Sequence, residues 1–278
     1  MSHVLSDADI AQFEREGYLS PVPILGLGEA NEYRVKLEQL EAQQGGHLVG
    51  LQRNKAHLLF KWLDDLIRDP RILDPIEQLI GPNLLCWNTI FWIKESGSKS
   101  FVSWHQDTRY WGLSSDKVVT AWLALSPALV ESGCMRVMPR THIGEVLPHE
   151  DRYDEDNMLT RGQEIADGVD ESVAVHMPLD TGQMSFHNYR LAHASGANSA
   201  PDRRIGISMH FMPTDTRQVV GDWDTAALVR GIDVHKHFED TQMPVSDMHA
   251  DAVAYHKRAA EQLNRVLYAG ATANTYKL

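Results

Sequence analysis

The chain has 278 residues, of which 43% are hydrophobic, and a formal net charge of −12 at pH 7. This length and hydrophobic content suffice to bury a large core, and we expect residues 1–278 to form one domain. The acidic balance disfavours nucleic acid and anionic membrane surfaces as partners, because phosphate groups are bound by clustered lysine and arginine side chains.

Cysteine content and the N-terminal sequence bear on the compartment. Cys86 and Cys134 lie in apolar runs without a C-x-x-C spacing, so a disulfide framework is not expected. The first residues lack the basic and apolar regions of a secretory signal peptide. No apolar run reaches the roughly 18 residues that a membrane-spanning helix needs. These features predict a cytoplasmic protein without a membrane partner.

The first 80 residues have the patterns of helices and predict a mainly helical support. Ser6, followed by acidic residues, is typical of a helix N-terminus, and Gly17 is typical of the end of that helix. Helix-forming residues or apolar residues at helical spacing then recur in residues 29–44, 55–68 and 71–80.

From residue 81 onward the pattern changes to short runs rich in β-branched and aromatic residues. These runs cover residues 84–94, 118–125, 134–139, 173–179, 183–188 and 204–212. Many short strands favour a barrel or jelly-roll core over residues 81–215. The polar residues 143–172 lack the strand pattern and are expected to form a lid loop. Residues 216–278 are expected to be helical.

The segment Ser103-Trp104-His105-Gln106-Asp107 carries a candidate metal-binding pair. In a strand, residues i and i+2 point the same way, so His105 and Asp107 can direct a ring nitrogen and a carboxylate oxygen at one point. A second histidine would complete a facial triad, which leaves three coordination positions open. Because His-x-Asp also occurs by chance on surfaces, the pair needs support from the rest of the chain.

His193 has suitable surroundings for the third ligand. A strand-like segment precedes it, small residues follow it, and the pair Arg203-Arg204 opens the next strand-like run. An arginine at this distance across a turn could grip the far carboxylate of a dicarboxylic acid through two forked hydrogen bonds. Only one of the two arginines is expected to face inward, and the alternative is that they cap the strand or pair with Asp202.

Three blocks with this order and spacing resemble the phytanoyl-CoA dioxygenase family of iron(II)- and 2-oxoglutarate-dependent oxygenases. They are Trp104–Asp107, then Trp122–Leu125 with Glu131–Cys134 and Pro139–His142, then His193-Ala194-Ser195 with Arg204. The resemblance runs from about Gly81 to about Phe211. It implies a mainly β fold with flanking helices, namely the double-stranded β-helix or jelly roll also found in cupins. It also implies iron(II), 2-oxoglutarate and O₂ as cofactors.

The resemblance assigns roles to individual residues. His105, Asp107 and His193 match the catalytic iron ligands. Family members that halogenate have Ala or Gly at the position of Asp107, so this residue favours hydroxylation over halogenation. The family often has Gly-Ser-His where this chain has Arg140-Thr141-His142, a departure that concerns the local turn and not the metal site.

The co-substrate pocket is also implied by the family. Arg204 matches the residue that pairs with the C5 carboxylate of 2-oxoglutarate, and Ser195 matches a hydroxyl that hydrogen-bonds near that carboxylate. Trp122 and Gln106 match positions that line the same pocket.

Residues that face the primary substrate are expected on the strand before the metal motif, directly after that motif, where Trp111 also lies, in the lid, and before the apolar positions of the helix expected over residues 55–68. The candidates, each of which is also compatible with solvated surface, are Asn88, Tyr110, Asn157, Arg161, Gln163 and Lys55. We expect a small polar or anionic metabolite, with Arg161 reaching its anionic group. A lipid-like or natural-product scaffold is the alternative.

Two histidines and two rival functions remain. His142 and His187 are interpreted as core or supporting residues, because a buried histidine usually only finds a hydrogen-bond partner. A zinc hydrolase on the same ligands would not need Arg204, and zinc sites more often use three histidines, or two and a glutamate. A non-catalytic metal-binding jelly roll would bind 2-oxoglutarate without decarboxylating it.

Overall fold

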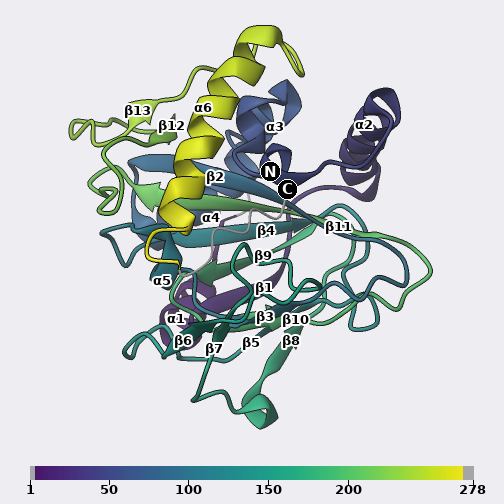
Figure 1. Cartoon of the computed structure of the whole chain (residues 1–278). Helices are drawn as coiled ribbons and strands as arrows, with labels where there is room; N and C mark the ends of the chain where they lie inside the picture. Colours follow the sequence, from purple (N-terminus) through teal and green to yellow (C-terminus); the bar gives the residue numbers. More distant parts are fainter. Residues whose placement is uncertain (1–3, 272–278) are drawn as a thin grey trace.

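A computed structural model describes residues 4–271, and within them two β-sheets form the centre of the molecule (Figure 1). The larger sheet has the strand order β1-β9-β4-β11-β2-β12-β13, and the smaller has the order β3-β10-β5-β8. The larger sheet comprises β1 (Tyr18–Pro23), β2 (Leu84–Lys94), β4 (Val119–Ala124), β9 (Gln183–Asn188), β11 (Arg204–Pro213), β12 (Thr225–Arg230) and β13 (Glu239–Asp240). The smaller comprises β3 (Val102–His105), β5 (Met135–Val137), β8 (Val175–Met177) and β10 (His193–Ser195). This arrangement confirms the predicted jelly roll.

Helices flank the sheets, as predicted. They are α1 (Asp7–Glu16), α2 (Leu27–Gln44), α3 (Lys61–Leu66), α4 (Pro70–Ile80), α5 (Thr108–Trp111) and α6 (Ala250–Leu267), with 3₁₀ turns η1 (Gly50–Arg53), η2 (Ala56–Leu58) and η3 (Glu171–Val173). Ser6 caps α1 as expected, because its Oγ accepts a hydrogen bond from Asp9 N at 3.2 Å. The N-terminal helices cover one face of the larger sheet, where Leu63 and Ile76 join the same buried cluster as Phe91. Side chains on the opposite face of the larger sheet line a cavity.

The expectation of a helical segment over residues 216–278 is wrong in its first half. Thr225–Arg230 forms β12, which pairs with β2, and the helix begins only at Ala250. Tyr18–Pro23 likewise forms a strand, β1, inside the region expected to be helical. Both strands obtain their hydrogen-bonding partners from distant parts of the chain, which a local pattern does not show.

Residues 143–172 contain a folded hairpin rather than an open loop. Strands β6 (His149–Asp151) and β7 (Gln163–Ile165) pair antiparallel. Ser103 in β3 anchors the hairpin, because its Oγ donates to Gln163 O at 2.5 Å and accepts from Asn157 Nδ2 at 2.8 Å. The segment is therefore part of the wall beside the smaller sheet.

The turn that departs from the family pattern keeps a backbone typical of glycine. Arg140 has φ +69°, in the left-handed region that glycine adopts most readily. Its guanidinium Nε donates to Glu16 Oε2 at 3.0 Å. His142 follows in the same turn and contacts α1, where its Nε2 lies 3.1 Å from Glu14 O. A Cβ at Gly17 would lie 2.5 Å from the His142 ring, so these contacts give His142 a structural role.

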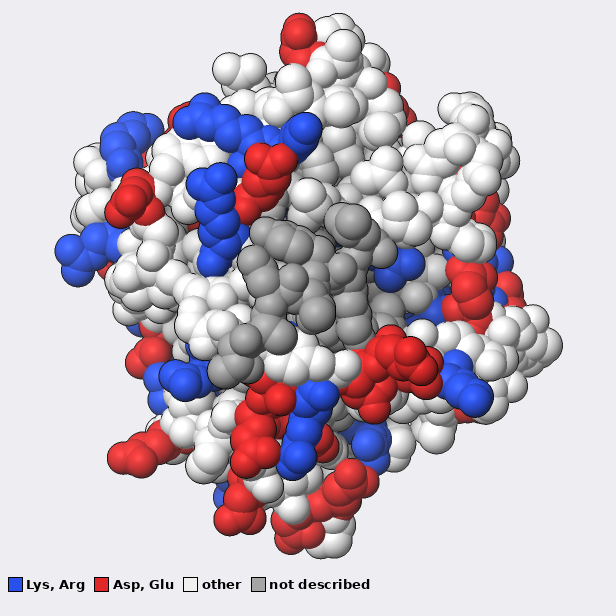
Figure 2. All heavy atoms as spheres, in the orientation of Figure 1, with Lys and Arg blue, Asp and Glu red and all other residues white. Residues whose placement is uncertain are grey.

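The surface charge and the lengths of the helices can be compared with the expectation that neither nucleic acid nor membrane is a partner. Figure 2 shows acidic and basic side chains interspersed over one face, with acidic side chains gathered in its lower half, where Figure 1 places β6 and β7. Within residues 4–271, no helix is both long and apolar enough to span a bilayer.

Candidate metal centre

Three side chains from two neighbouring strands converge at one point. His105 ends β3 and His193 begins β10, and the two residues are cross-strand partners in the smaller sheet. Asp107 lies beyond the end of β3, in the helical backbone conformation that leads into α5. The strand geometry expected for the His-x-Asp pair is therefore wrong at Asp107, although the side chain still turns towards His105.

The distances between these side chains suit a metal ion. Asp107 Oδ1 lies 3.3 Å from His105 Nε2, and Asp107 Oδ2 lies 4.0 Å from His193 Nε2. One ligand atom from each residue lies within 4.8 Å of the others. Two imidazoles and one carboxylate on one side of a cavity form the donor set of a facial triad.

Hydrogen bonds orient the two imidazoles, and burial sets the protonation of the imidazoles and of the Asp107 carboxyl group, in ways that suit a bound cation. His105 Nδ1 bonds to Ser103 O at 2.9 Å and His193 Nδ1 to Leu191 O at 3.0 Å, which directs both Nε2 atoms inward. Burial lowers the pKa of both imidazoles to about 4, so both are neutral ligands near pH 7. Burial raises the pKa of Asp107 to about 6, a shift that a bound cation would oppose. The residues present therefore fit a divalent metal.

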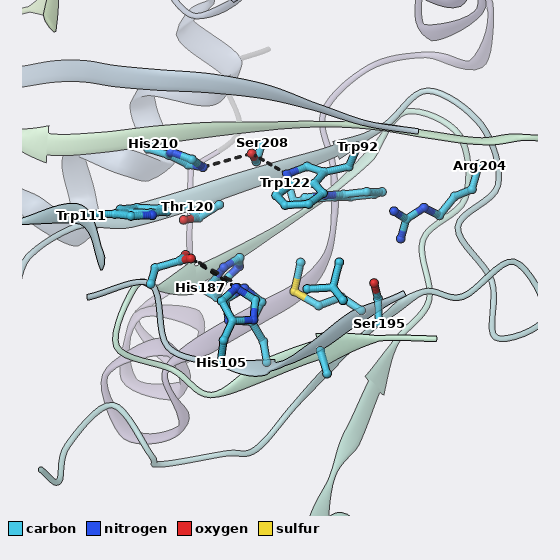
Figure 3. Close-up of a pocket in the computed structure, with 15 residues that line it drawn as sticks. Trp92, His105, Trp111, Thr120, Trp122, His187, Ser195, Arg204, Ser208 and His210 are labelled. Atoms are coloured by element: carbon cyan, nitrogen blue, oxygen red, sulfur yellow. Dashed lines mark hydrogen bonds and ion pairs between the residues drawn. The ribbon is translucent and has the colours of Figure 1, made fainter. Parts of the chain in front are cut away.

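The metal-binding side chains line one end of a cavity, and a buried arginine lies at the other (Figure 3). Arg204 is only 3% exposed, and its Nη1 donates to Gly133 O at 2.8 Å, while its Nε has no partner among residues 4–271. The guanidinium lies 5.3 Å from the ring centroid of Trp122, which lines the cavity together with Ser195. Burial lowers the pKa of Arg204 to about 10.

Glycine is required beside this arginine. A Cβ at Gly206 would lie 1.9 Å from the Trp122 ring, so a larger residue in β11 would displace that ring from its place beside Arg204. Arg203 points the other way, as predicted for one of the pair, and its Nη1 lies 2.6 Å from Glu41 Oε2.

Gln106 does not line this cavity, which corrects its expected place in the co-substrate pocket. Its Nε2 donates to Arg190 O at 2.6 Å and its Oε1 accepts from Leu147 N at 2.7 Å. As the neighbour of His105 at the end of a strand, it faces the opposite side, where it joins loops.

Four of the expected substrate-facing residues also lie elsewhere. Asn88 is buried and its Oδ1 accepts from Lys55 N at 2.7 Å. Lys55 is fully buried in an ion pair, with Nζ 3.1 Å from Asp224 Oδ1. Arg161 donates through Nε to Asp151 Oδ2 at 2.9 Å and through Nη1 to main-chain carbonyls, and it covers the ring of Tyr110. These side chains therefore have protein partners away from the metal-binding side chains.

The other two expected residues, Asn157 and Gln163, line a second and larger cavity of about 380 Å³. This chamber shares Trp92, Asp107 and Trp111 with the metal cavity, so the two spaces adjoin. Both amide side chains also make hydrogen bonds that hold the hairpin in place. Gln163 Oε1 accepts from Arg161 N at 3.1 Å, and Asn157 Nδ2 donates to Ser103 Oγ.

Sequence reasoning missed a polar row on the wall of the cavity. His187, Thr120 and His210 are cross-strand partners in β9, β4 and β11, and all three line the cavity. They are at most 2% exposed, and both ring nitrogens of His187, Nδ1 of His210 and Oγ1 of Thr120 have no hydrogen-bond partner in the described part of the chain. His187 is buried beside His193, as expected of a core or supporting residue, but its ring nitrogens lack the hydrogen-bond partner that this interpretation assumed among the described residues. Only the spacing from His193 hinted at its position, because the other two residues come from separate strands.

Comparison with known proteins assigns the family. A model described as phytanoyl-CoA dioxygenase (PhyH) matches residues 13–206. The chain belongs to the phytanoyl-CoA dioxygenase family. Peroxisomal phytanoyl-CoA dioxygenase of Homo sapiens is 32% identical over 154 residues, which cover 54% of this chain and 46% of the human protein. The chain thus matches about half the length of this relative.

Two solved structures are similar over most of the chain. The apo form of the non-heme monooxygenase ThoJ has 30% sequence identity and a TM-score of 0.82, covering 94% of this chain and 97% of that chain. CytC3 with Fe(II) and α-ketoglutarate has 25% identity and a TM-score of 0.65, covering 85% and 93%. The predicted family and jelly-roll fold are confirmed, and enzymes of this family use iron(II), 2-oxoglutarate and O₂.

Proposed function

We propose that this protein is an iron(II)- and 2-oxoglutarate-dependent dioxygenase that hydroxylates a C–H group of a small, anionic metabolite. The observation that carries the proposal is a single cavity with His105, Asp107 and His193 at one end and a buried arginine, without a carboxylate partner among its hydrogen bonds, at the other. Bound iron would supply O₂ activation, in which 2-oxoglutarate becomes succinate and CO₂ and one oxygen atom enters the substrate.

Different side chains of this protein would bind the metal and the co-substrate. His105, Asp107 and His193 would hold the metal and leave three positions open on the cavity side. Arg204 and Ser195 would bind the far carboxylate of 2-oxoglutarate, and Trp122 would cover the pocket between them. Because these groups are buried, the co-substrate would bind away from bulk water, where charge-assisted hydrogen bonds are strong.

Substrate would enter through the adjoining chamber, where Arg53 is the cation best placed to bind an anion. Its Nε donates to Leu48 O at 2.8 Å. The carboxylates that act on its charge, Glu41 and Glu95, are both ion-paired with Arg203. Burial lowers the pKa of Arg53, and the charges of Glu41 and Glu95 only partly oppose this shift. Apolar walls, among them Ile90, Leu159 and Trp111, favour a substrate with an apolar body.

The test of the reaction is 2-oxoglutarate turnover by protein loaded with iron(II) under anaerobic conditions and then exposed to O₂. We expect His105→Ala and Asp107→Ala to lose both iron binding and succinate production. Arg204→Ala should raise the 2-oxoglutarate requirement far more than the iron requirement, since it lies at the far end of the cavity. The control Arg217→Ala, an exposed arginine, should change neither.

Two results would contradict the proposal. Full activity in His105→Ala or Asp107→Ala would refute the assignment of the metal ligands. Hydrolysis of a substrate by the zinc-loaded protein, without succinate release in the iron-loaded form, would favour the hydrolase instead.

A further inference from the structure

Lys94, the last residue of β2, is a buried lysine outside the proposed set of ligands. Its side chain is fully buried, and its Nζ donates to Ser195 Oγ at 2.7 Å, to Ser195 O at 3.3 Å and to Gly196 O. An ammonium group has three N–H donors, so these three acceptors occupy all of them. Each acceptor is neutral, whereas a buried lysine is normally paired with a carboxylate.

A second buried cation lies beside Lys94. Arg204 is its cross-strand partner in β11, and the hydrogen bond that Arg204 makes is also to a neutral acceptor, Gly133 O. The groups that act on the charge of Lys94 are Arg204, which repels it, and the buried thiol of Cys134. Two adjacent cations without a counter-ion are unfavourable in a buried site, so this end of the cavity requires an anion.

The hydrogen bond to Ser195 also has a direction. The Lys94 ammonium group can only donate, so Ser195 Oγ is the acceptor and its own proton remains free for another partner. Ser195 lines the cavity and lies at the same end as Arg204 in Figure 3. An oxygen of an anion between the two would accept this proton.

We propose that Lys94 is a positioning residue for the co-substrate: it holds the Ser195 hydroxyl as a donor and adds positive charge at the C5 carboxylate of 2-oxoglutarate. This inference rests on the proposed function. It predicts that Lys94 discriminates between 2-oxo acids that have a distal carboxylate and those that do not.

The experiment measures binding by calorimetry, without O₂, to the iron(II)-loaded protein. The ligands are 2-oxoglutarate and 2-oxopentanoate, which has a methyl group in place of the distal carboxylate. Lys94→Met should weaken 2-oxoglutarate binding about tenfold to a hundredfold, the effect of losing a charge-assisted contact, and leave 2-oxopentanoate binding nearly unchanged. Lys94→Gln, which retains a donor for Ser195 without the charge, should be intermediate. Lys99→Met, which removes an exposed lysine nearby, should match the wild type.

The pH dependence gives a second readout that a purely structural role would not change. Burial and the adjacent Arg204 lower the pKa of Lys94 to about 6, so without an anion the lysine loses its proton near neutral pH, and the ammonium group described above is the form that a bound anion stabilises. A bound carboxylate raises that pKa, so binding takes up a proton and weakens as pH rises, by at most about tenfold per pH unit. Burial holds the pKa of Cys134 above its usual value, and Arg204 titrates near 10, so neither accounts for this window. Lys94→Met should abolish the slope.

The outcomes separate the two proposals. Wild-type protein that binds neither 2-oxo acid would overturn the proposed function and this inference with it. If the wild type binds 2-oxoglutarate but Lys94→Met weakens both ligands equally, or neither, the role of Lys94 is refuted and the proposed function stands. Lys94→Gln, with melting temperatures for all variants, covers the case in which Lys94→Met does not fold.

Discussion

Arg53 is the residue on which the substrate class depends. We expect small apolar carboxylates or phosphates to stimulate succinate release, and their neutral amides or esters to fail, because Arg53 faces the chamber and has no ion pair with any residue of 4–271. Arg53→Met should raise the KM for the active anion about tenfold or more, with little change in the KM for 2-oxoglutarate. A screen of matched anionic and neutral compounds measures this.

The control for Arg53 is the exposed Arg217, whose replacement by methionine should have no effect on either KM. Stimulation by neutral lipid-like or natural-product compounds, with Arg53→Met as active as the wild type, would support the alternative substrate class instead.

At the scale of elements, hairpin β6–β7 depends on Arg161. This arginine and Asp151 are 11% and 14% exposed, and Arg161 also bonds to Ala269 O at 3.2 Å, which ties the hairpin to the C-terminal end of α6. Arg161→Met should therefore lower the free energy of unfolding by about 1–3 kcal/mol, because it leaves a half-buried carboxylate without its partner. Urea denaturation measures the change, and limited proteolysis within residues 152–162 should speed up.

Arg152 offers a matched control in the same hairpin. It is 57% exposed and pairs with Glu150 at 3.1 Å, so Arg152→Met should change stability by no more than about 0.5 kcal/mol. Unchanged stability of Arg161→Met together with a raised substrate KM would return Arg161 to the role that the sequence first indicated, as a substrate-binding residue.

At the scale of the whole molecule, the ion pair Lys55–Asp224 joins the N-terminal region to the last part of the larger sheet. Lys55 Nζ also donates to Trp87 O at 2.9 Å, and Asp224 Oδ2 accepts from Trp87 Nε1 at 2.6 Å. Lys55→Met should destabilise the fold by about 3–5 kcal/mol, because a carboxylate remains buried without its cation. Lys55→Met with Asp224→Asn should recover part of that loss in a urea denaturation cycle.

Lys61 provides the comparison, since its partner Asp65 lies four residues away on an exposed helix face. Lys61→Met should cost about 0.5 kcal/mol or less. If the Lys55 and Lys61 variants lost equal stability, or the double variant recovered nothing, the pair would not have the joining role that its position suggests.

The accuracy of sequence reasoning differs between side chains of the site. His105, Asp107, His193, Arg204 and Ser195 belong to motifs whose spacing is set by adjacent strands, and all five line one cavity. Thr120 and His210 stand in apolar runs that carry no motif, so their place in the cavity wall depends on the register between β4 and β11. Lys94 reaches Ser195 from β2, whose register with β11 places it opposite Arg204. Register pairs residues far apart in the chain, which a single sequence does not show.

By itself, the sequence determined the family, the jelly roll, the flanking helices and the residues at the two ends of the cavity, because each leaves a local pattern of polarity or spacing. Tertiary structure alone decided that 225–230 joins the larger sheet, that Arg161 and Lys55 are ion-paired with Asp151 and Asp224, and that Lys94 lies behind Ser195. The physical reason is that the sequence does not show whether a charged side chain faces solvent, an ion-pair partner or a ligand. Only the residues packed around it in the folded protein distinguish the three.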